Sequence, residues 1–557
     1  MANADEAALP YHEPHIVTIL ILVSFMLLLN LANHIIDKIL YCGLLAQLFL
    51  GIGWGTPGAN WLGREFEHVA VNLGYLGLLL IVYEGGLMTS FKALKDNILL
   101  SAGVAITGIA LPIGASYILL TLVGATLLQA FAAGAALCST SLGTTFTVMK
   151  ASGLITTRMG IVLTSAAMMD DVVGLIMVQV ISNIGGASSS FSAVTIVRPV
   201  CVSIGFVGVV PLLARFIIRP LTIWLNCKRT ASPTGYISYI LTRGATTLIL
   251  HLSILIGLIT ATTYAGTSNL FAAYLAGASI SWWDTTVPHP RAHGSGTNLS
   301  TNETGRPPSV LSATSGTTGV ETFERFFFQP FQRILKPLFF ASIGFSVPIT
   351  RMFDGDVIWR GVIFTIFMFV SKFACGLWLM RLPGLASGVL RLGRRSDTEK
   401  KPTGENKMGT VAAVAGSGCV SDPQQATSGG IVMQTSSPVP GKKQSAPRQS
   451  NEGRARTRSA VTSTSKPISL YSGCIVGCAM VARGEIGFLI SALAESNGIF
   501  GDEPNGPIFL VVTWAIMLCT IIGPLIVGIL VSRVKKMEVG AAGRSGRKSV
   551  LGDWGVS

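Results

Sequence analysis

Three observations predict an all-α membrane protein. Half of the 557 residues are hydrophobic and only 12% are charged, and the mean hydropathy is +0.58. Soluble domains carry about 25% charged residues, so this chain is too apolar to fold in water. Its charges lie between apolar segments of roughly 20 residues, the length of helix that crosses the ~30 Å hydrocarbon core of a bilayer.

The apolar segments predict about thirteen spanning helices. The first of them, Ile16 to Ile36, is too long for the hydrophobic part of a signal peptide and has no basic leader, so we expect it to be retained as a spanning helix. The expected spans cover residues 16–36, 40–56, 68–89, 98–122, 125–149, 158–182, 194–217, 236–262, 267–283, 328–349, 357–380, 468–496 and 506–532.

Basic residues predict the orientation of the chain. The net charge is +14, but most of this charge lies in polar loops and near the C-terminus, so it does not indicate a nucleic-acid partner. With the N-terminus outside, the external loops hold only Arg64, Arg351 and Arg360, with Arg198 at a helix edge. The positive-inside rule therefore predicts an external or lumenal N-terminus and a cytosolic C-terminus. The pattern does not distinguish the plasma membrane from an endomembrane.

Two long loops divide the expected domains. Residues 284–325 and 384–466 are rich in Ser, Thr, Gly and Pro and have no apolar periodicity, so we expect both to be disordered in the cytosol. The sequons at Asn298 and Asn302 would then stay unmodified. The expected order is an external segment (1–15), a first membrane part with the Asp-Asp helix (16–283), the first loop (284–325), a membrane part with Lys372 (326–383), the second loop (384–466), the last two spans (467–533) and a basic cytosolic tail (534–557).

Two of the expected helices carry matching interruptions. Six helices, a linking helix and six inverted helices would form an inverted repeat, in which the fifth helix corresponds to the twelfth. The fifth contains the polar stretch from Cys138 to Thr145, CSTSLGTT, and the twelfth contains RGEIG from Arg483 to Gly487. Such residues let a membrane helix unwind where it lines a cavity. A small-residue packing surface is the alternative, but the matching positions favour a functional break.

Ionisable side chains deep in a membrane are costly and usually mark ion pathways. Adjacent helical residues point about 100° apart, so one carboxylate of an Asp-Asp pair can be paired while the other faces an ion path. Because ionising both buried acids is unfavourable, one of them can hold a proton or a bare cation in turn. The candidates are Asp170, Asp171, Lys372, Arg483 and Glu485, with Glu84 nearer a helix end.

The basic candidates need partners on other helices. Lys372 has no acid on its own helix, so we expect it to pair with the aspartates; snorkelling to the membrane surface is the alternative. Arg483 and Glu485 are two residues apart and do not face one another on a regular helix. We expect them to organise the broken helix.

Five segments together resemble the monovalent cation:proton antiporter superfamily. They are MMDDVVGLIM, STSLGTTFTV, PLFFASIGFSVPI, the mid-helix Lys372 and MVARGEIGFLI. The closer branch is the one that includes bacterial sodium/proton antiporters with paired aspartates and Kef-type potassium efflux systems. The resemblance covers nearly all of the membrane part and neither long loop.

The resemblance implies a dimer whose subunits each have a dimerisation domain and a moving core domain with two crossed, broken helices. Asp171 matches the aspartate that binds the ion or proton, and Asp170 its neighbour, often paired with the lysine matched by Lys372. Thr140 and Ser141 fall in the unwound stretch beside the site. The family works by elevator-like alternating access.

We therefore expect a secondary transporter that exchanges Na⁺ or K⁺ for protons, with no enzymatic activity and no cofactor. Its partners would be Na⁺, K⁺ or Li⁺, protons, membrane lipid and a second copy of the chain. Cys474 and Cys478 lie one turn apart without a second Cys or His pair, so no metal site is expected. The alternatives are a gated potassium efflux or channel-like protein on the same fold, or a non-transporting membrane sensor or scaffold.

Overall fold

The structure is a computed structural model of the chain. It describes residues 13–40, 43–141, 149, 153–154, 157–185, 193–231, 235–236, 239, 244–287, 318–380, 470–501, 506–542, 551 and 554. The loop expected at 384–466 and the sequons at Asn298 and Asn302 lie outside the described residues.

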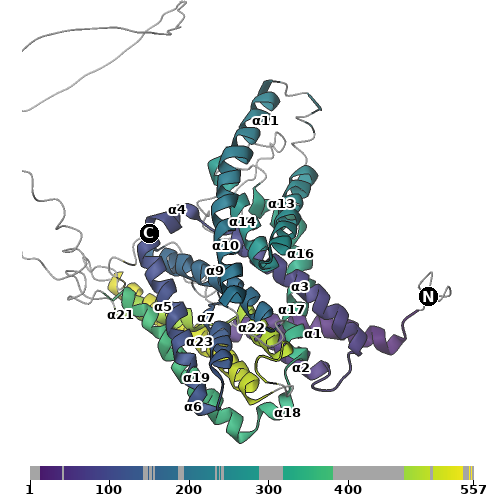
Figure 1. Ribbon diagram of the computed structural model, residues 1–557, viewed down its shortest axis with the longest axis vertical. Helices are drawn as coiled ribbons and strands as arrows, with labels where there is room; N and C mark the ends of the chain where they lie inside the picture. Colours follow the sequence, from purple (N-terminus) through teal and green to yellow (C-terminus); the bar gives the residue numbers. More distant parts are fainter. Residues whose placement is uncertain are drawn as a thin grey trace, which may run out of the picture. The chain divides into compact units, whose positions relative to one another are not determined.

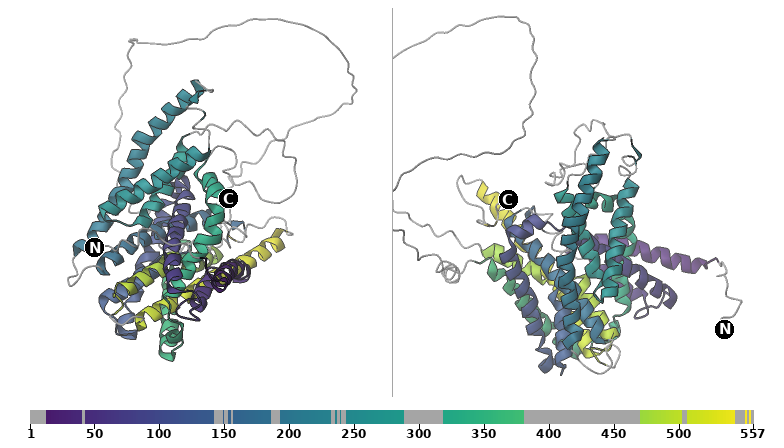
Figure 2. Two further views of the ribbon diagram at one scale, coloured as in Figure 1. Left: turned by 90° about the vertical axis from the view of Figure 1, so that its right-hand side faces the viewer. Right: turned by 45° about the horizontal axis from the view of Figure 1, so that its top comes forward.

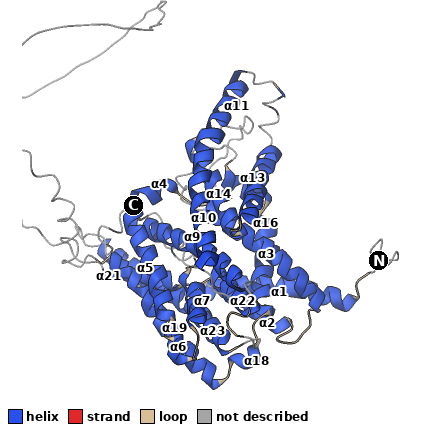
Figure 3. Cartoon of the chain, in the orientation of Figure 1, coloured by secondary structure: helices blue, strands red, loops and turns tan. Residues whose placement is uncertain are grey.

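Every regular element in this part of the chain is a helix, as Figure 3 shows. Nine helical runs are long and apolar enough to cross a membrane, among the residues described. The prediction of an all-α membrane protein is confirmed, whereas the number of about thirteen spans stays a prediction.

The helices are labelled in Figure 1. Their bounds are α1 Ile16–Leu40, α2 Gly43–Trp54, α3 Arg64–Leu87, α4 Phe91–Asp96, α5 Ile98–Ser116, α6 Leu119–Leu122, α7 Leu127–Cys138, α9 Arg158–Gly185, α10 Ala193–Leu213, η3 Ala214–Ile218, α11 Arg219–Ala231, α13 Gly244–Ala265, α14 Asn269–Thr286, α15 Gly319–Phe326, α16 Phe328–Pro330, η4 Phe331–Leu335, α17 Lys336–Phe345, α18 Ile349–Met352, α19 Gly355–Phe373, η5 Ala374–Trp378, α21 Leu470–Val481, α22 Glu485–Ser496 and α23 Pro507–Ala542.

The helices pack in two groups, visible in Figure 1 and Figure 2. In the first, α2 and α3 pack against α17, α1 packs against α2, and α14 packs against α3 and α13. In the second, α5 packs against α7, α9 and α19, while α21 and α23 pack against each other and against α19. The helix α22 completes this second group through contacts with α7 and α9. The groups meet where α14 contacts α9, where α17 contacts α22 and where α1 contacts α23, and α10 packs against α9.

Glycines allow a close helix contact between α3 and α14 in the first group. A Cβ atom added to Gly86 of α3 would lie 2.3 Å from the backbone oxygen of Tyr274, and one added to Gly277 of α14 would lie 2.3 Å from that of Tyr83. Small residues that let backbones approach in this way are typical of membrane helix interfaces. The contact between α3 and α14 therefore requires glycine on both sides.

The range 284–325, expected to be a disordered loop, is partly helical. The helix α14 extends to Thr286, and α15 occupies the last residues of the range. The Thr318 side chain accepts a hydrogen bond from the Glu321 amide and caps α15, and the Gly319 amide donates to Asp284 Oδ2 at 2.6 Å. Phe323 is buried in an aromatic group with Tyr83, Phe327 and Phe331. The prediction of disorder is wrong for this part, because burial of one aromatic side chain and a helix cap stabilise a short segment that has no long apolar pattern.

Two helices extend far beyond the spans predicted from hydrophobicity. The run that begins at α10 continues through η3 and α11 to Ala231, and α23 continues to Ala542, into the range expected to be a tail. Apolar length sets only the part of a helix that crosses the hydrocarbon core. Polar residues with good helix propensity extend a helix beyond it.

The α3–α14 contact gives a direct test of the packing. We expect Gly277→Ala to lower the free energy of unfolding by about 1–3 kcal/mol, because the new methyl group meets backbone that cannot move aside. The measurement is a thermal melt in detergent. The matched control is Gly257→Ala in α13, where an added Cβ has no atom within 4 Å and should be neutral or stabilising. Equal melting temperatures for the two variants would contradict the contact.

Candidate ion-binding site

The helix α7 ends at the first predicted break. A capping box between Thr126 and Gln129 begins the helix, and it ends at Cys138, after which Ser139 is extended with φ −74° and ψ 149°. Thr140 and Ser141 follow without helical structure. Ser and Thr side chains compete with helical hydrogen bonds, which accounts for an end at this position. The rest of the polar stretch, from Leu142 to Thr145, lies outside the described residues.

The second predicted break separates α21 from α22 and meets the end of α7. Residues 482–484 are not helical, and the Ala482 carbonyl oxygen accepts a hydrogen bond from the Ser141 amide at 2.9 Å. A Cβ atom on Gly484 would lie 2.6 Å from both Cβ and Oγ of Ser141. The two interruptions therefore contact one another, and this contact requires glycine at position 484.

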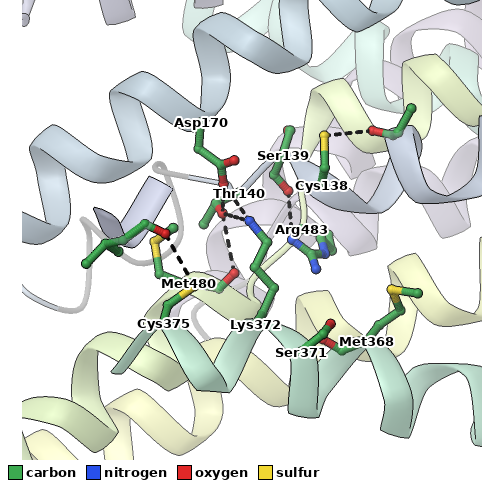
Figure 4. Close-up of polar contacts among 12 residues, drawn as sticks. Cys138, Ser139, Thr140, Asp170, Met368, Ser371, Lys372, Cys375, Met480 and Arg483 are labelled. Carbon is green, nitrogen blue, oxygen red and sulfur yellow. Dashed lines mark hydrogen bonds and ion pairs between the residues drawn. The ribbon is translucent and has the colours of Figure 1, made fainter. Parts of the chain in front are cut away.

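A buried ion pair, drawn in Figure 4, involves Thr140, the residue before Ser141. Lys372 Nζ of α19 lies 2.5 Å from Asp170 Oδ2 of α9, and both side chains are fully buried. Thr140 joins the pair, because its hydroxyl donates to Asp170 Oδ2 at 2.5 Å and accepts from Lys372 Nζ at 2.8 Å. Three elements thus converge on one carboxylate oxygen, and Lys372 does not snorkel.

Arg483 links the non-helical segment before α22 to the segment after α7. Its side chain is fully buried, and Nη1 donates to the Ser139 carbonyl oxygen at 2.9 Å, next to the C-terminus of α7. The last carbonyls of a helix carry partial negative charge, which a guanidinium stabilises. The Thr520 hydroxyl of α23 donates to the Arg483 carbonyl oxygen at 3.0 Å, so the backbone of the break is held as well.

Asp171 and Glu485 remain outside the ion pair. Both side chains are half-buried, and Asp171 Oδ1 has no hydrogen-bond partner among the described residues. Ser141 Oγ is buried and also has no partner there. The structure thus brings Asp170, Thr140 and Lys372 into one contact, places Ser141 and Arg483 at the crossing and leaves Asp171 outside the ion pair.

Glu84 lies away from the crossing. It is half-buried in α3, where its charged neighbours are Lys336 and Glu324. The structure therefore does not bring this sixth candidate to the ion pair.

Several groups at the crossing carry no signal in the sequence. The carbonyl oxygens of Ser139, Met480 and Ala482 all accept hydrogen bonds there, and every residue type has such an oxygen. Gly108 of α5 lies against the ammonium group, since an added Cβ would be 3.3 Å from Lys372 Nζ. Thr520 is recognisable in the sequence as a polar residue in an apolar helix. Its position does not indicate that it binds the Arg483 carbonyl oxygen.

The transmembrane sodium/hydrogen exchanger family matches residues 20–396 of the chain. The chain belongs to this family. It is accordingly a multi-pass integral membrane protein, and the resemblance to the cation:proton antiporter superfamily is confirmed.

Individual relatives of the chain match over shorter segments. It is 30% identical over 144 residues to the high-affinity Na⁺/H⁺ antiporter NhaS3 of Synechocystis sp., covering 25% of this chain and 31% of that protein. It is 29% identical over 201 residues to the probable Na⁺/H⁺ antiporter GerT of Bacillus cereus, covering 35% and 53%. A third relative is the Na⁺/H⁺-K⁺ antiporter GerN of Bacillus cereus, 29% identical over 133 residues, which are 24% and 34% of the two chains. The matches thus span between a third and about half of each relative.

Among solved structures, the chain is similar to the sodium proton antiporter MjNhaP1 of Methanocaldococcus jannaschii. The TM-score is 0.49 at 13% identity, over 93% of this chain and 98% of that one.

The buried ion pair of this exchanger family member is testable by a double-mutant cycle. We expect Asp170→Asn and Lys372→Gln each to destabilise the protein by about 3–5 kcal/mol, because each leaves one buried charge without its partner. The double variant should recover much of this loss, since neither charge remains. Thermal melts in detergent measure all three, with exposed Lys92→Gln as a control for loss of a lysine. Additive losses would show that the two side chains do not interact.

Proposed function

We propose that this chain is a secondary antiporter that exchanges a monovalent cation, Na⁺ or K⁺, for protons at Asp171. The observation that carries the proposal is that one of the two adjacent aspartates is in an ion pair and the other is not. The charge of Asp170 is balanced by Lys372, whereas Asp171 is half-buried and forms no ion pair among the described residues. Each of the two carboxylates has one oxygen, Oδ1, without a hydrogen-bond partner there.

A carboxylate in this position supports exchange by competition. Ionised and unpaired in a membrane, it is costly, and either a proton or a bare cation removes that cost. The two ligands exclude each other, because both neutralise the same charge. Alternate occupation of Asp171 from the two sides of the membrane couples cation movement in one direction to proton movement in the other.

The crossing of the broken helices supplies the other groups that cation binding needs. A cation that leaves water must exchange its hydration shell for oxygen ligands. Ser141 Oγ has no hydrogen-bond partner within the described part of the chain, and we assign it to the cation together with Asp171. Thr140 is occupied by Asp170 and Lys372, so its role is to fix the ion pair beside the site.

We propose alternating access as the transport mechanism. Inverted-repeat transporters bind at mid-membrane on discontinuous helices and expose the site by moving one group of helices against the other. The arrangement of α7, α9, α19, α21 and α22 around the ion pair supports such a moving group. A homodimer in a lipid bilayer, with the N-terminus external or lumenal and the C-terminus cytosolic, completes the proposal.

The names of the relatives support transport of either ion. Two are called Na⁺/H⁺ antiporters and one a Na⁺/H⁺-K⁺ antiporter, and all three names describe transporters, so no covalent chemistry is proposed here. Purified protein in liposomes with an internal pH dye, supplied separately with Na⁺, K⁺ and Li⁺, would identify the cation.

The decisive variant is Asp171→Asn. We expect its exchange to fall to the level of empty liposomes while the protein remains folded, because an amide neither binds a proton in this range nor supplies a full charge to a cation. Asp96→Asn, an exposed acid at the end of α4, should exchange at the wild-type rate.

Three outcomes would contradict the proposal. Exchange by folded Asp171→Asn at nearly the wild-type rate would remove Asp171 from the mechanism. Potassium flux that persists without a proton gradient would indicate a channel-like protein. An absence of flux for all three cations in folded wild-type protein would favour a sensor or scaffold.

A further inference from the structure

Glu485 is placed close to Asp171 by the packing of α22 on α9. It is the first residue of α22, directly after the break. A Cβ atom on Gly174 of α9 would lie 2.9 Å from Ser139 Cβ and 3.2 Å from Ile486 Cγ2. Gly174 follows Asp171 by three residues and so lies on the same side of α9. The start of α22 therefore packs one turn from Asp171.

The charges around Asp171 come from several helices. Glu485 of α22, its neighbour Asp170 and Lys372 of α19 are charged residues that lie near Asp171. Tyr274 of α14 also lies near Asp171, and its hydroxyl lies 3.1 Å from Thr89 Oγ1. Two carboxylates from different helices therefore repel each other at this point.

The crossing has one more acid than base. Asp170, Asp171 and Glu485 carry three negative charges when ionised, and Lys372 and Arg483 carry two positive charges, which leaves a formal charge of −1. Lys372 is held by Asp170 and Thr140, and Arg483 Nη1 by the Ser139 carbonyl oxygen. Neither Asp171 nor Glu485 forms an ion pair within the part of the chain that the structure describes. The uncompensated charge therefore belongs to these two carboxylates.

A further oxygen lies at the same place. Ser141 is 2% exposed, its Oγ has no hydrogen-bond partner among the described residues, and it contacts Gly484, the residue before Glu485. A buried hydroxyl without a partner is costly, and this one lies against the backbone that leads into the carboxylate pair. A single cation between the carboxylates would balance the excess negative charge of Asp171 and Glu485. It would also give the Ser141 hydroxyl oxygen a partner.

We propose that Glu485 is a direct ligand of the transported ion, so that Asp171 and Glu485 share one monovalent cation or one proton, with Ser141 Oγ as an additional cation ligand. This inference rests on the exchange function proposed above and extends it to a second carboxylate. The competing explanation is that Glu485 only complements the positive end of α22, as acids in the first turn of a helix commonly do.

Transport kinetics of Glu485→Gln separate these explanations. If Asp171 and Glu485 share the ion, this variant removes one of its charged ligands. The apparent KM for the cation should then rise by about tenfold or more. The pH at half-maximal activity should move to lower values, because the remaining carboxylate has lost a negative neighbour that favours its protonation. A role confined to the helix end predicts a lower melting temperature with an unchanged KM and pH profile.

Glu495→Gln is the matched control, because it removes the same charge from the last turn of the same helix and should leave KM and the pH profile unchanged. A second readout is cation binding itself. Na⁺ or K⁺ in place of choline should raise the melting temperature of wild-type protein by mass action, and Glu485→Gln should lose most of this increase.

Wild-type KM, pH profile and cation-dependent melting in Glu485→Gln would overturn the inference. If that variant does not fold, Glu485→Asp decides: a raised KM supports direct contact, since its carboxylate reaches less far, and a wild-type KM overturns it. Failure here differs from failure of the proposed function. In the first case Asp171→Asn is inactive while Glu485→Gln behaves as wild type, and in the second the wild-type protein itself does not exchange.

Discussion

The structure around the site depends on burying the ion pair of Asp170 and Lys372. Removing two charges from water is expensive, and their attraction offsets this cost only when the geometry is good and further hydrogen bonds complete it. Thr140 supplies that hydrogen bond from the non-helical end of α7, and Gly108 leaves room for the ammonium group. The positions of α9, α19 and the segment after α7 are therefore coupled through one carboxylate oxygen, and α5 packs against the ammonium group.

The interrupted helices are a consequence of the same constraint. Thr140 reaches the ion pair only because α7 has ended, and the freed backbone is satisfied by the opposite break, where Ala482 accepts from the Ser141 amide. Arg483 adds a positive charge at the carbonyl end of α7. Interruptions in mid-membrane are tolerated where protein groups replace the lost helical hydrogen bonds, and here each break supplies groups for the other.

In this arrangement the residues that hold the helices together are not the residue to which ion binding is assigned in the proposal. One aspartate, the lysine and the threonine occupy each other, so their charges are fixed inside the second group of helices. In the proposed exchange, the neighbouring aspartate, about 100° around α9, binds the ion, and the excess of one acid at the crossing favours a cation or proton there. Such a site would release its ion without breaking the pair that holds the helices together.

The sequence by itself determined the membrane class, the place of both breaks and five of the six charged candidates, since Glu84 lies away from the crossing. Apolar length, small polar residues in an apolar helix, and isolated charges are local features with direct energetic consequences in a bilayer. The resemblance already implied that Lys372 pairs with Asp170, which the residue pattern alone left open, and the tertiary structure shows that pair. Only the tertiary structure decided that Arg483 binds a backbone carbonyl and that α15 is ordered. Those outcomes depend on which helix faces lie together. Neither the carbonyl partner of Arg483 nor the burial of Phe323 can be predicted from the local residue pattern.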